Sequence, residues 1–173
     1  MCDIMIGKQV IKMMKNIEIE FKTQISENTY HSLLSEFNLE NNVFKQVNYY
    51  FDSENLDLNK QNIVLRIRQK GENHYKVTLK KQSDFEAYEY HVLLQKNQAK
   101  DMLKNGFNTK DYFDDLDYFV TFKVSLDNYR VSTPFAVGTL FLDRNEYCGL
   151  TDYEIEYEVD HYEEGMKVFH DFL

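Results

Sequence analysis

Apolar and polar side chains alternate with a period of two along most of this chain. Residues 153–159 show the pattern clearly, because every second position there is a glutamate. Such alternation is typical of β-strands, in which successive side chains point to opposite faces. It predicts about eight strands, at residues 15–23, 46–51, 63–69, 75–81, 87–94, 118–131, 138–143 and 153–159.

Helical patterns fall between these strands. Ser26 and Asn97 are predicted to cap two amphipathic helices, and Gly106 is placed to end the second one. Residues 111–116 predict a short turn of helix, and residues 163–173 predict a helix at the C-terminus. Because the chain has no internal repeat and no break in composition, we predict a single α+β domain.

Eight strands and few helices favour a mostly antiparallel sheet, and eight strands are enough to close a barrel. Two arrangements remain open at this point. In a half-buried open sheet, the charged face meets solvent. In a barrel covered by helices, the apolar face packs outward and the charged face lines the lumen. Alternation by itself does not choose between them.

Composition supports one folded protein in a reducing compartment. The chain has 173 residues and 43% hydrophobic content, which is enough for one core. Cys2 and Cys148 form neither a disulfide framework nor a C-x-x-C pair, which favours a cytoplasmic location. The absence of a run of 18 apolar residues predicts no transmembrane helix. Residues 1–14 make a poor signal peptide, so we predict an N-terminal extension. This extension need not be native, because Met13 and Met14 offer alternative starts of translation.

The net charge of −9 argues against a nucleic-acid polymer as partner, because an acidic protein repels the phosphate backbone. The charge is nevertheless unevenly distributed. Residues 60–81 contain one acidic residue, Glu72, and seven basic residues: Lys60, Arg66, Arg68, Lys70, Lys76, Lys80 and Lys81. This segment is a candidate anion site, with a solvated strand face as the alternative.

Two predicted strands carry rows of carboxylates on one face. These acidic residues are Glu18, Glu20, Glu154, Glu156 and Glu158. Residues on one face of a strand lie about 7 Å apart, so the like charges repel and a divalent cation would relieve the repulsion. Oxygen ligands favour Mg²⁺ or Mn²⁺ over zinc. Arg66 and Arg68 offer forked donors suited to phosphate oxygens, so together the charges fit a metal-chelated polyphosphate.

A series of short motifs runs along the chain in a fixed order. The sequence E-I-E-F-K at residues 18–22 is followed by motifs at 50–52, 65–68 and 78–80, by Glu89 with His91, by Arg130, and by motifs at 142–143 and 153–158. This series resembles the CYTH family of triphosphate tunnel metalloenzymes. It is most similar to the stand-alone type found in Gram-positive bacteria.

The resemblance implies an eight-stranded antiparallel β-barrel with a charged tunnel and a few flanking helices. It implies hydrolysis of an inorganic or organic triphosphate with Mg²⁺ or Mn²⁺. The implied metal ligands are Glu18, Glu20, Glu154 and Glu156. The implied catalytic residues, which also bind phosphate, are Lys22, Arg66, Arg68, Lys80 and Arg130, and the implied substrate-binding set adds Lys76, Glu89 and Asp143. Lys76 and Glu158 match the family motif less firmly.

Family members usually continue through a longer C-terminal helix that carries another basic residue. The resemblance therefore implies that residues 15–173 form one tunnel domain with a truncated last helix. Two other functions stay open: an adenylate cyclase of the same fold, and a non-catalytic binder of polyphosphate or nucleotide. No element that reads a nucleobase stands out, which favours an inorganic substrate. We expect a bacterial, cytoplasmic protein with a small polyanionic substrate and no membrane partner, as a monomer or homodimer.

Overall fold

The computed structural model of the protein describes residues 14–82 and 87–173. Residues 1–13, which make up nearly all of the predicted N-terminal extension and include Cys2, lie outside the described residues. Within the described ranges, no helix combines the length and the apolar composition that crossing a membrane requires.

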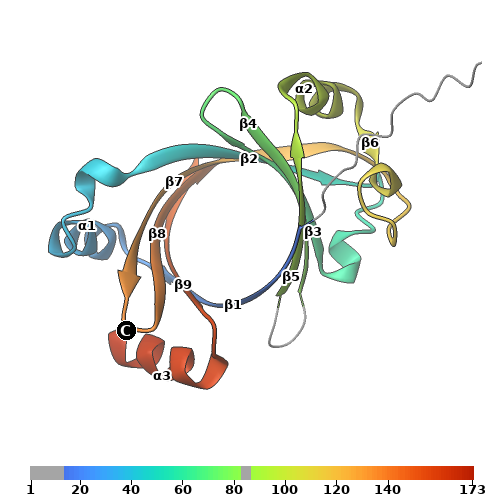
Figure 1. The fold of residues 1–173 in the computed structure, drawn as a ribbon. Coiled ribbons are helices and arrows are strands. Elements are labelled where there is room, and N and C mark those ends of the chain that lie inside the picture. Colours follow the sequence, from blue (N-terminus) through green and yellow to red (C-terminus); the bar gives the residue numbers. More distant parts are fainter. Residues whose placement is uncertain (1–13, 83–86) are drawn as a thin grey trace, which may run out of the picture.

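Eight long antiparallel strands close into one barrel, seen along its axis in Figure 1. They are β1 (Met14–Ile25), β2 (Phe44–Asp52), β3 (Ile63–Lys70), β4 (His74–Gln82), β5 (Ala87–Leu94), β7 (Phe119–Phe135), β8 (Gly138–Tyr147) and β9 (Leu150–Val159). The order around the barrel is β2-β3-β4-β5-β1-β9-β8-β7, and the pairing of β7 with β2 completes the circle. The short strand β6 (Phe107–Asn108) adds to β7. The predicted α+β barrel is confirmed.

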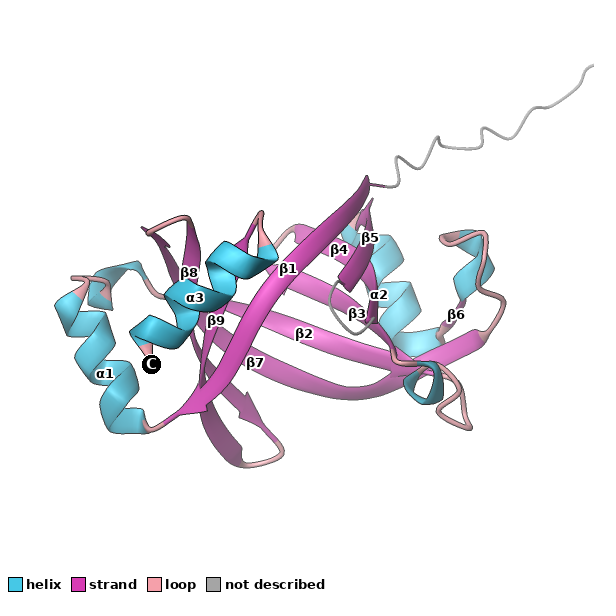
Figure 2. Cartoon of the chain, turned by 90° about the horizontal axis from the view of Figure 1, so that it is seen from below, coloured by secondary structure: helices cyan, strands magenta, loops and turns pink. Residues whose placement is uncertain are grey.

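Three α-helices lie outside the barrel in the described part of the chain: α1 (Glu27–Glu36), α2 (Lys96–Asn105) and α3 (Tyr162–Phe172). Figure 2 shows α3 lying across the outer face of β1, with α2 toward the other end of the molecule. Apolar residues that point out of the barrel pack under these helices, as Ile155 and Tyr157 of β9 do against Phe169 of α3. Ile67 and Val77 belong to a second cluster that contains α2 residues. Because the apolar faces are buried on the outside, the charged faces line the lumen.

The predicted helix ends are partly right. Ser26 caps α1, since its hydroxyl accepts a hydrogen bond from the backbone N–H of Thr29 at 3.1 Å. Gly106, with φ of 76°, follows the last residue of α2. The prediction of Asn97 as the cap of α2 is wrong, because Gln95 forms a reciprocal capping box with Gln98 and starts the helix earlier.

The predicted helical turn at residues 111–116 is also wrong. A 3₁₀ turn occupies Thr109–Asp111 instead. The buried Thr109 hydroxyl donates to the carbonyl of Leu116 at 2.8 Å and accepts from the backbone N–H of Tyr118 at 2.9 Å. These two bonds hold residues 109–118 as a compact loop, so the backbone does not continue into a helix.

Candidate active site

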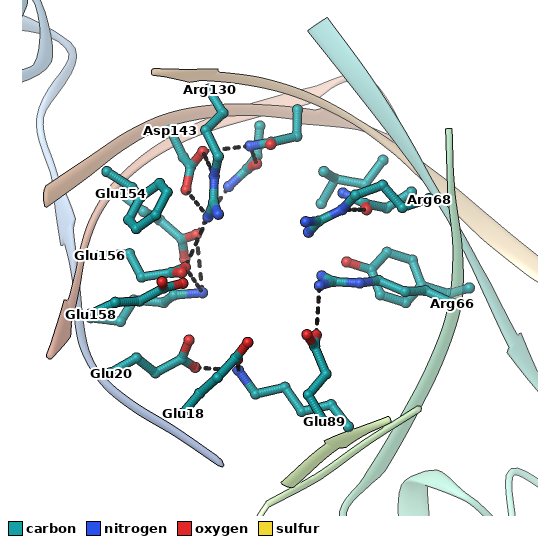
Figure 3. A pocket seen from close by; sticks show the side chains of 18 of the residues that line it. Glu18, Glu20, Arg66, Arg68, Glu89, Arg130, Asp143, Glu154, Glu156 and Glu158 are labelled. Carbon is teal, nitrogen blue, oxygen red and sulfur yellow. Dashed lines mark hydrogen bonds and ion pairs between the residues drawn. The ribbon is translucent and has the colours of Figure 1, made fainter. Parts of the chain in front are cut away.

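Side chains from the inner face of the barrel surround a cavity of about 320 Å³, which we call the tunnel. Its charged lining residues are Glu18, Glu20, Lys22, Arg66, Arg68, Lys76, Lys80, Glu89, Arg130, Asp143, Glu154, Glu156 and Glu158. All twelve predicted site residues are therefore brought together, although they lie as far apart in sequence as Glu18 and Glu156. Their chemical roles remain predictions. Figure 3 shows Arg66 and Arg68 on one side of the tunnel and a row of glutamates on the opposite side.

The basic wall belongs to β3 and β4. Arg66 Nη2 lies 3.3 Å from Glu89 Oε1, whereas Arg68 Nε donates only to the neutral side chain of Asn48, at 2.9 Å. Burial, helped by the nearby charges of Arg66 and Arg130, lowers the pKa of Arg68 to about 9. Burial likewise lowers the pKa of Lys76, which faces Arg68 across the strand pair. These cations are poorly compensated, so an anion in the tunnel would stabilise both.

Three carboxylates form a cluster on the other wall. One oxygen from each of Glu18, Glu20 and Glu158 lies within 4.8 Å of the others. Burial and repulsion from Glu156 and Glu18 raise the pKa of Glu158 to about 7. Burial and the carboxylate of Glu89 raise the pKa of Glu18. Lys80, which pairs with Glu18 and Glu20, only partly offsets these effects. An all-oxygen ligand set of this kind fits Mg²⁺ or Mn²⁺.

The cluster differs in composition from the predicted metal ligands. Glu156 is engaged by cations, at 3.0 Å from Arg130 Nη2 and 3.1 Å from Lys22 Nζ. Burial opposes ionisation of Glu156, but the charges of Arg130 and Lys22 outweigh it and lower its pKa to about 2. Glu154 lies 3.9 Å from Lys22 and accepts a hydrogen bond from Asn145. Both predicted ligands are therefore in the tunnel, but they lie outside the group of carboxylates close enough to share one ion.

The register of β1 and β9 explains why Glu158 joins the cluster. Glu20 pairs directly with Glu158, and Lys22 pairs with Glu156. The two strands therefore place two glutamates opposite each other at one pair, and a lysine opposite a glutamate two residues further along the strands. The even spacing of the three β9 glutamates indicated a shared face, but only the register shows which one lies opposite a carboxylate of β1.

Cations also hold the two acidic rows in place. Arg130 makes a bidentate pair with Asp143, with Nε–Oδ1 and Nη2–Oδ2 distances of 2.8 and 2.7 Å. Lys80 Nζ lies 2.7 Å from Glu20 Oε1 and 3.5 Å from Glu18 Oε2. Charge-assisted pairs of this kind restrict side-chain motion. The tunnel wall is therefore preorganised before any ligand binds.

Sequence reasoning missed several neutral polar residues of the tunnel. They are Asn48, Tyr50, Asn128 and Asn145. Asn128 Nδ2 donates to both Asp143 and Asn145 at 2.8 Å, so it belongs to the same buried network. Their positions along the strands could have identified them, because each shares a strand face with a predicted site residue or with another member of this group.

Two residues of the sequence motifs, Asp52 and His91, do not line the tunnel. The carboxylate of Asp52 accepts hydrogen bonds from the backbone N–H groups of Ser53, Leu58 and Asn59, at 2.7 to 3.0 Å, and so shapes the turn after β2. His91 is buried on the same strand face as Glu89, and its Nδ1 lies 4.0 Å from Glu89 Oε2. Asp52 therefore supports the barrel from outside the tunnel.

We predict that Mg²⁺ or Mn²⁺ raises the melting temperature by about 5–10 °C at a hundredfold excess over its Kd. Because the pKa of Glu158 is raised to about 7, its ionisation costs stability as the pH rises from the ordinary carboxyl range through 7. A bound cation competes with that proton. The metal-induced rise measured by scanning fluorimetry should therefore be about 3–6 °C smaller at pH 6 than at pH 8, corresponding to about tenfold weaker binding.

The variant Glu158→Gln provides the control for this measurement, since it cannot lose a proton. In this variant the metal-induced rise should be small and nearly equal at both pH values. An equal rise at pH 6 and pH 8 in the unaltered protein would contradict a role for Glu158 in holding the cation.

Comparison with known proteins shows one consistent relationship. The sequence model of the CYTH domain matches residues 16–173. YjbK of Bacillus subtilis, provisionally named a triphosphatase, is 31% identical over 174 residues, which cover 93% of this chain and 87% of that protein. A Bacillus halodurans crystal structure, provisionally described as an adenylate cyclase, is 32% identical with a TM-score of 0.83, covering 92% of this chain and 89% of that chain.

A more distant solved structure has the same fold. It is HpAC1 from Hippeastrum, a provisionally assigned adenylyl cyclase described as revealing a dominant triphosphatase activity. The TM-score is 0.71 at 22% identity, and the match covers 92% of this chain and 86% of that chain. The barrel fold is therefore shared at a level of identity where most side chains differ.

Proposed function

The chain belongs to the CYTH domain family, and on that premise we propose that it hydrolyses a triphosphate inside the tunnel with the help of a divalent cation. The observation that carries the proposal is the separation of charge across the tunnel (Figure 3). Arg66 and Arg68 lie on one wall and the cluster of Glu18, Glu20 and Glu158 lies on another. A metal-chelated triphosphate is complementary to both walls.

The tunnel residues act mainly by positioning the substrate and stabilising its charge. Phosphoryl transfer passes through a loose transition state whose charge is spread over the phosphate oxygens. Arg66, Arg68 and Lys76 would donate to these oxygens, and Arg68 and Lys76 would gain the anionic partner that they lack among the described carboxylates. A divalent cation, when held by the carboxylate cluster, supplies charge neutralisation and lowers the pKa of a water molecule.

The reaction itself exchanges one bond to phosphorus for another. The oxygen of a water molecule forms a bond to the terminal phosphorus while the bond between that phosphorus and the bridging oxygen breaks. The products are orthophosphate and a diphosphate, and the proton from water is released to solvent. Arg130 is already shared between Asp143 and Glu156, so we assign it the task of keeping the acidic wall in place beside the substrate.

The related proteins support hydrolysis and also point to a second candidate. YjbK carries a triphosphatase name, and HpAC1 is described by a dominant triphosphatase activity. The Bacillus halodurans relative is provisionally described as an adenylate cyclase. In that reaction the ribose 3′-hydroxyl of ATP attacks the innermost phosphorus, diphosphate leaves and the hydroxyl proton is released to solvent. The tunnel cations would neutralise the phosphate charge in this reaction too.

An assay with inorganic triphosphate and with ATP tests the proposal, using Mg²⁺ or Mn²⁺ in parallel. We expect orthophosphate to form only with metal, to stop when EDTA is added, and to resume when excess metal restores the free cation. Chromatography of the ATP reaction should show ADP rather than cyclic AMP. Cyclic AMP with diphosphate would instead establish the cyclase, and the absence of orthophosphate from both substrates would refute hydrolysis.

We also propose that residues 15–173 act as one tunnel domain, because all eight barrel strands lie within that range apart from the first residue of β1. We propose a cytoplasmic location in a bacterium. Cys148 is exposed and free, and two relatives at more than 30% identity come from Bacillus species.

A further inference from the structure

Two buried polar side chains in the barrel have no hydrogen-bond partner among the described residues. They are Thr78 of β4, through its Oγ1 atom, and His91 of β5, through its Nδ1 atom. The two residues are only 1% and 6% exposed. Buried polar groups without a partner are uncommon and costly in folded proteins. A group that reached both atoms would therefore gain two hydrogen bonds.

The strand register places these two residues beside the basic wall. Thr78 alternates with Lys76 and Lys80 on β4, so it shares their inward face. It pairs directly with Arg66 of β3 on one side and with His91 of β5 on the other. Arg66, Thr78 and His91 therefore form one row across three strands, and of this row only Arg66 lines the tunnel.

Glu89 lies between the two ends of this row. Its Oε1 is 3.3 Å from Arg66 Nη2 (Figure 3), and its Oε2 is 4.0 Å from His91 Nδ1. The second distance is about 1 Å too long for a hydrogen bond, so a small rotation of the glutamate side chain would close it. Glu89 pairs directly with Lys80, which makes Thr78 its diagonal neighbour. Diagonal neighbours are about 7–8 Å apart, which a glutamate side chain can span.

Substrate binding would remove the cation on which Glu89 depends. Glu89 is buried, and Arg66 is the only lysine or arginine of the described residues within 4.0 Å of its carboxylate. A phosphate that engages Arg66 competes for the same guanidinium and repels the carboxylate. The negative charge of Glu18 adds to this repulsion. When the tunnel is filled, Glu89 therefore needs other hydrogen-bond donors.

We propose that Thr78 and His91 are positioning residues, which receive the Glu89 carboxylate when a triphosphate in the tunnel engages Arg66. In that state the Thr78 hydroxyl and the His91 Nδ1–H donate to the carboxylate, and Arg66 is released to the phosphate. A neutral imidazole can carry its proton on Nδ1, because the hydrogen-bond partner sets the tautomer. The inference rests on the proposed function, since it describes how the basic wall adapts to that substrate.

Calorimetric binding of diimidotriphosphate with Mg²⁺ tests the exchange without turnover, because NH groups replace both bridging oxygens of this analogue. Binding should be about tenfold weaker for His91→Phe, which keeps a buried ring without a donor, and about fivefold weaker for Thr78→Val. His91→Asn, whose amide can donate from near the Nδ1 position, should bind within about twofold of the unaltered protein. His31→Phe removes an exposed imidazole from α1 and provides the matched control.

A purely structural role for His91 predicts a different pattern. Glu89→Gln lacks the carboxylate charge, so in that background His91→Phe should change the affinity by less than about twofold. Nuclear magnetic resonance gives a direct readout. The ¹⁵N signal of His91 Nδ1, identified by its loss in His91→Asn, should shift when the analogue binds to the unaltered protein.

Several results would overturn the inference. They are equal weakening by His91→Phe in both backgrounds, unchanged affinity in folded His91→Phe and Thr78→Val, an Nδ1 signal that does not respond, and failure of the analogue to bind. Circular dichroism checks the fold, and Thr78→Val decides the question if His91→Phe does not fold. If the analogue binds with the expected pattern but no triphosphate is hydrolysed, hydrolysis fails as the function while the exchange of partners stands.

Discussion

Replacing Arg66 by alanine should lower kcat/KM for triphosphate hydrolysis by about 10²–10³, the size of effect seen when one preorganised donor to a developing charge is removed. The guanidinium lies in the tunnel, where its only described carboxylate partner is Glu89, at 3.3 Å. Its loss removes a forked donor to phosphate and leaves Glu89 to repel the substrate. Steady-state kinetics with inorganic triphosphate at saturating metal provides the measurement.

The fold should survive this substitution, because Arg66 points into the tunnel while its neighbours Leu65 and Ile67 remain buried in the outer core. Circular dichroism and the melting temperature check this point. Arg66→Lys should recover part of the rate, since a lysine keeps the charge but loses the fork. Lys60→Ala removes an exposed cation next to β3 and should have no effect. A folded Arg66→Ala protein with a near-normal rate would show that the basic wall is not the phosphate site.

Replacing Glu18 by alanine should reduce metal-dependent hydrolysis by a similar factor, about 10²–10³, through loss of one ligand from the carboxylate cluster. The metal concentration needed for half-maximal rate should also rise. The measurement is the rate of orthophosphate release as a function of Mg²⁺ or Mn²⁺ concentration at constant substrate.

The stability of the same variant gives a second and independent readout. Burial and the Glu89 carboxylate raise the pKa of Glu18, so its charged form is destabilised in the folded protein at neutral pH. Removing the Glu18 carboxylate should leave the melting temperature without metal unchanged or raised. The increase in melting temperature that metal causes should disappear. Glu18→Gln tests whether charge or shape matters, and Glu40→Ala removes an exposed carboxylate as a control. A normal metal response in folded Glu18→Ala would exclude this carboxylate as a ligand.

Much of the site could be predicted from the sequence, because strand alternation is a local property. Once Glu18, Arg66 and Glu156 are assigned to strands, their period-two neighbours must share their faces, and the charged faces collect the candidate residues. The helix cap at Ser26 is local in the same way. The cap at Gln95 escaped prediction because it depends on a reciprocal bond with Gln98, which a search for the usual short capping residues does not detect.

Local alternation therefore specifies the strands, their charged and apolar faces, and the residue types available for chemistry. Which face looks inward is a property of the folded protein, because it depends on barrel closure through β2 and β7 and on helices that cover the apolar faces. The tertiary structure also places Glu158 beside Glu20, and Glu156 beside Lys22. The two β1–β9 pairs join residues more than 130 positions apart, and no local pattern specifies a register over that separation.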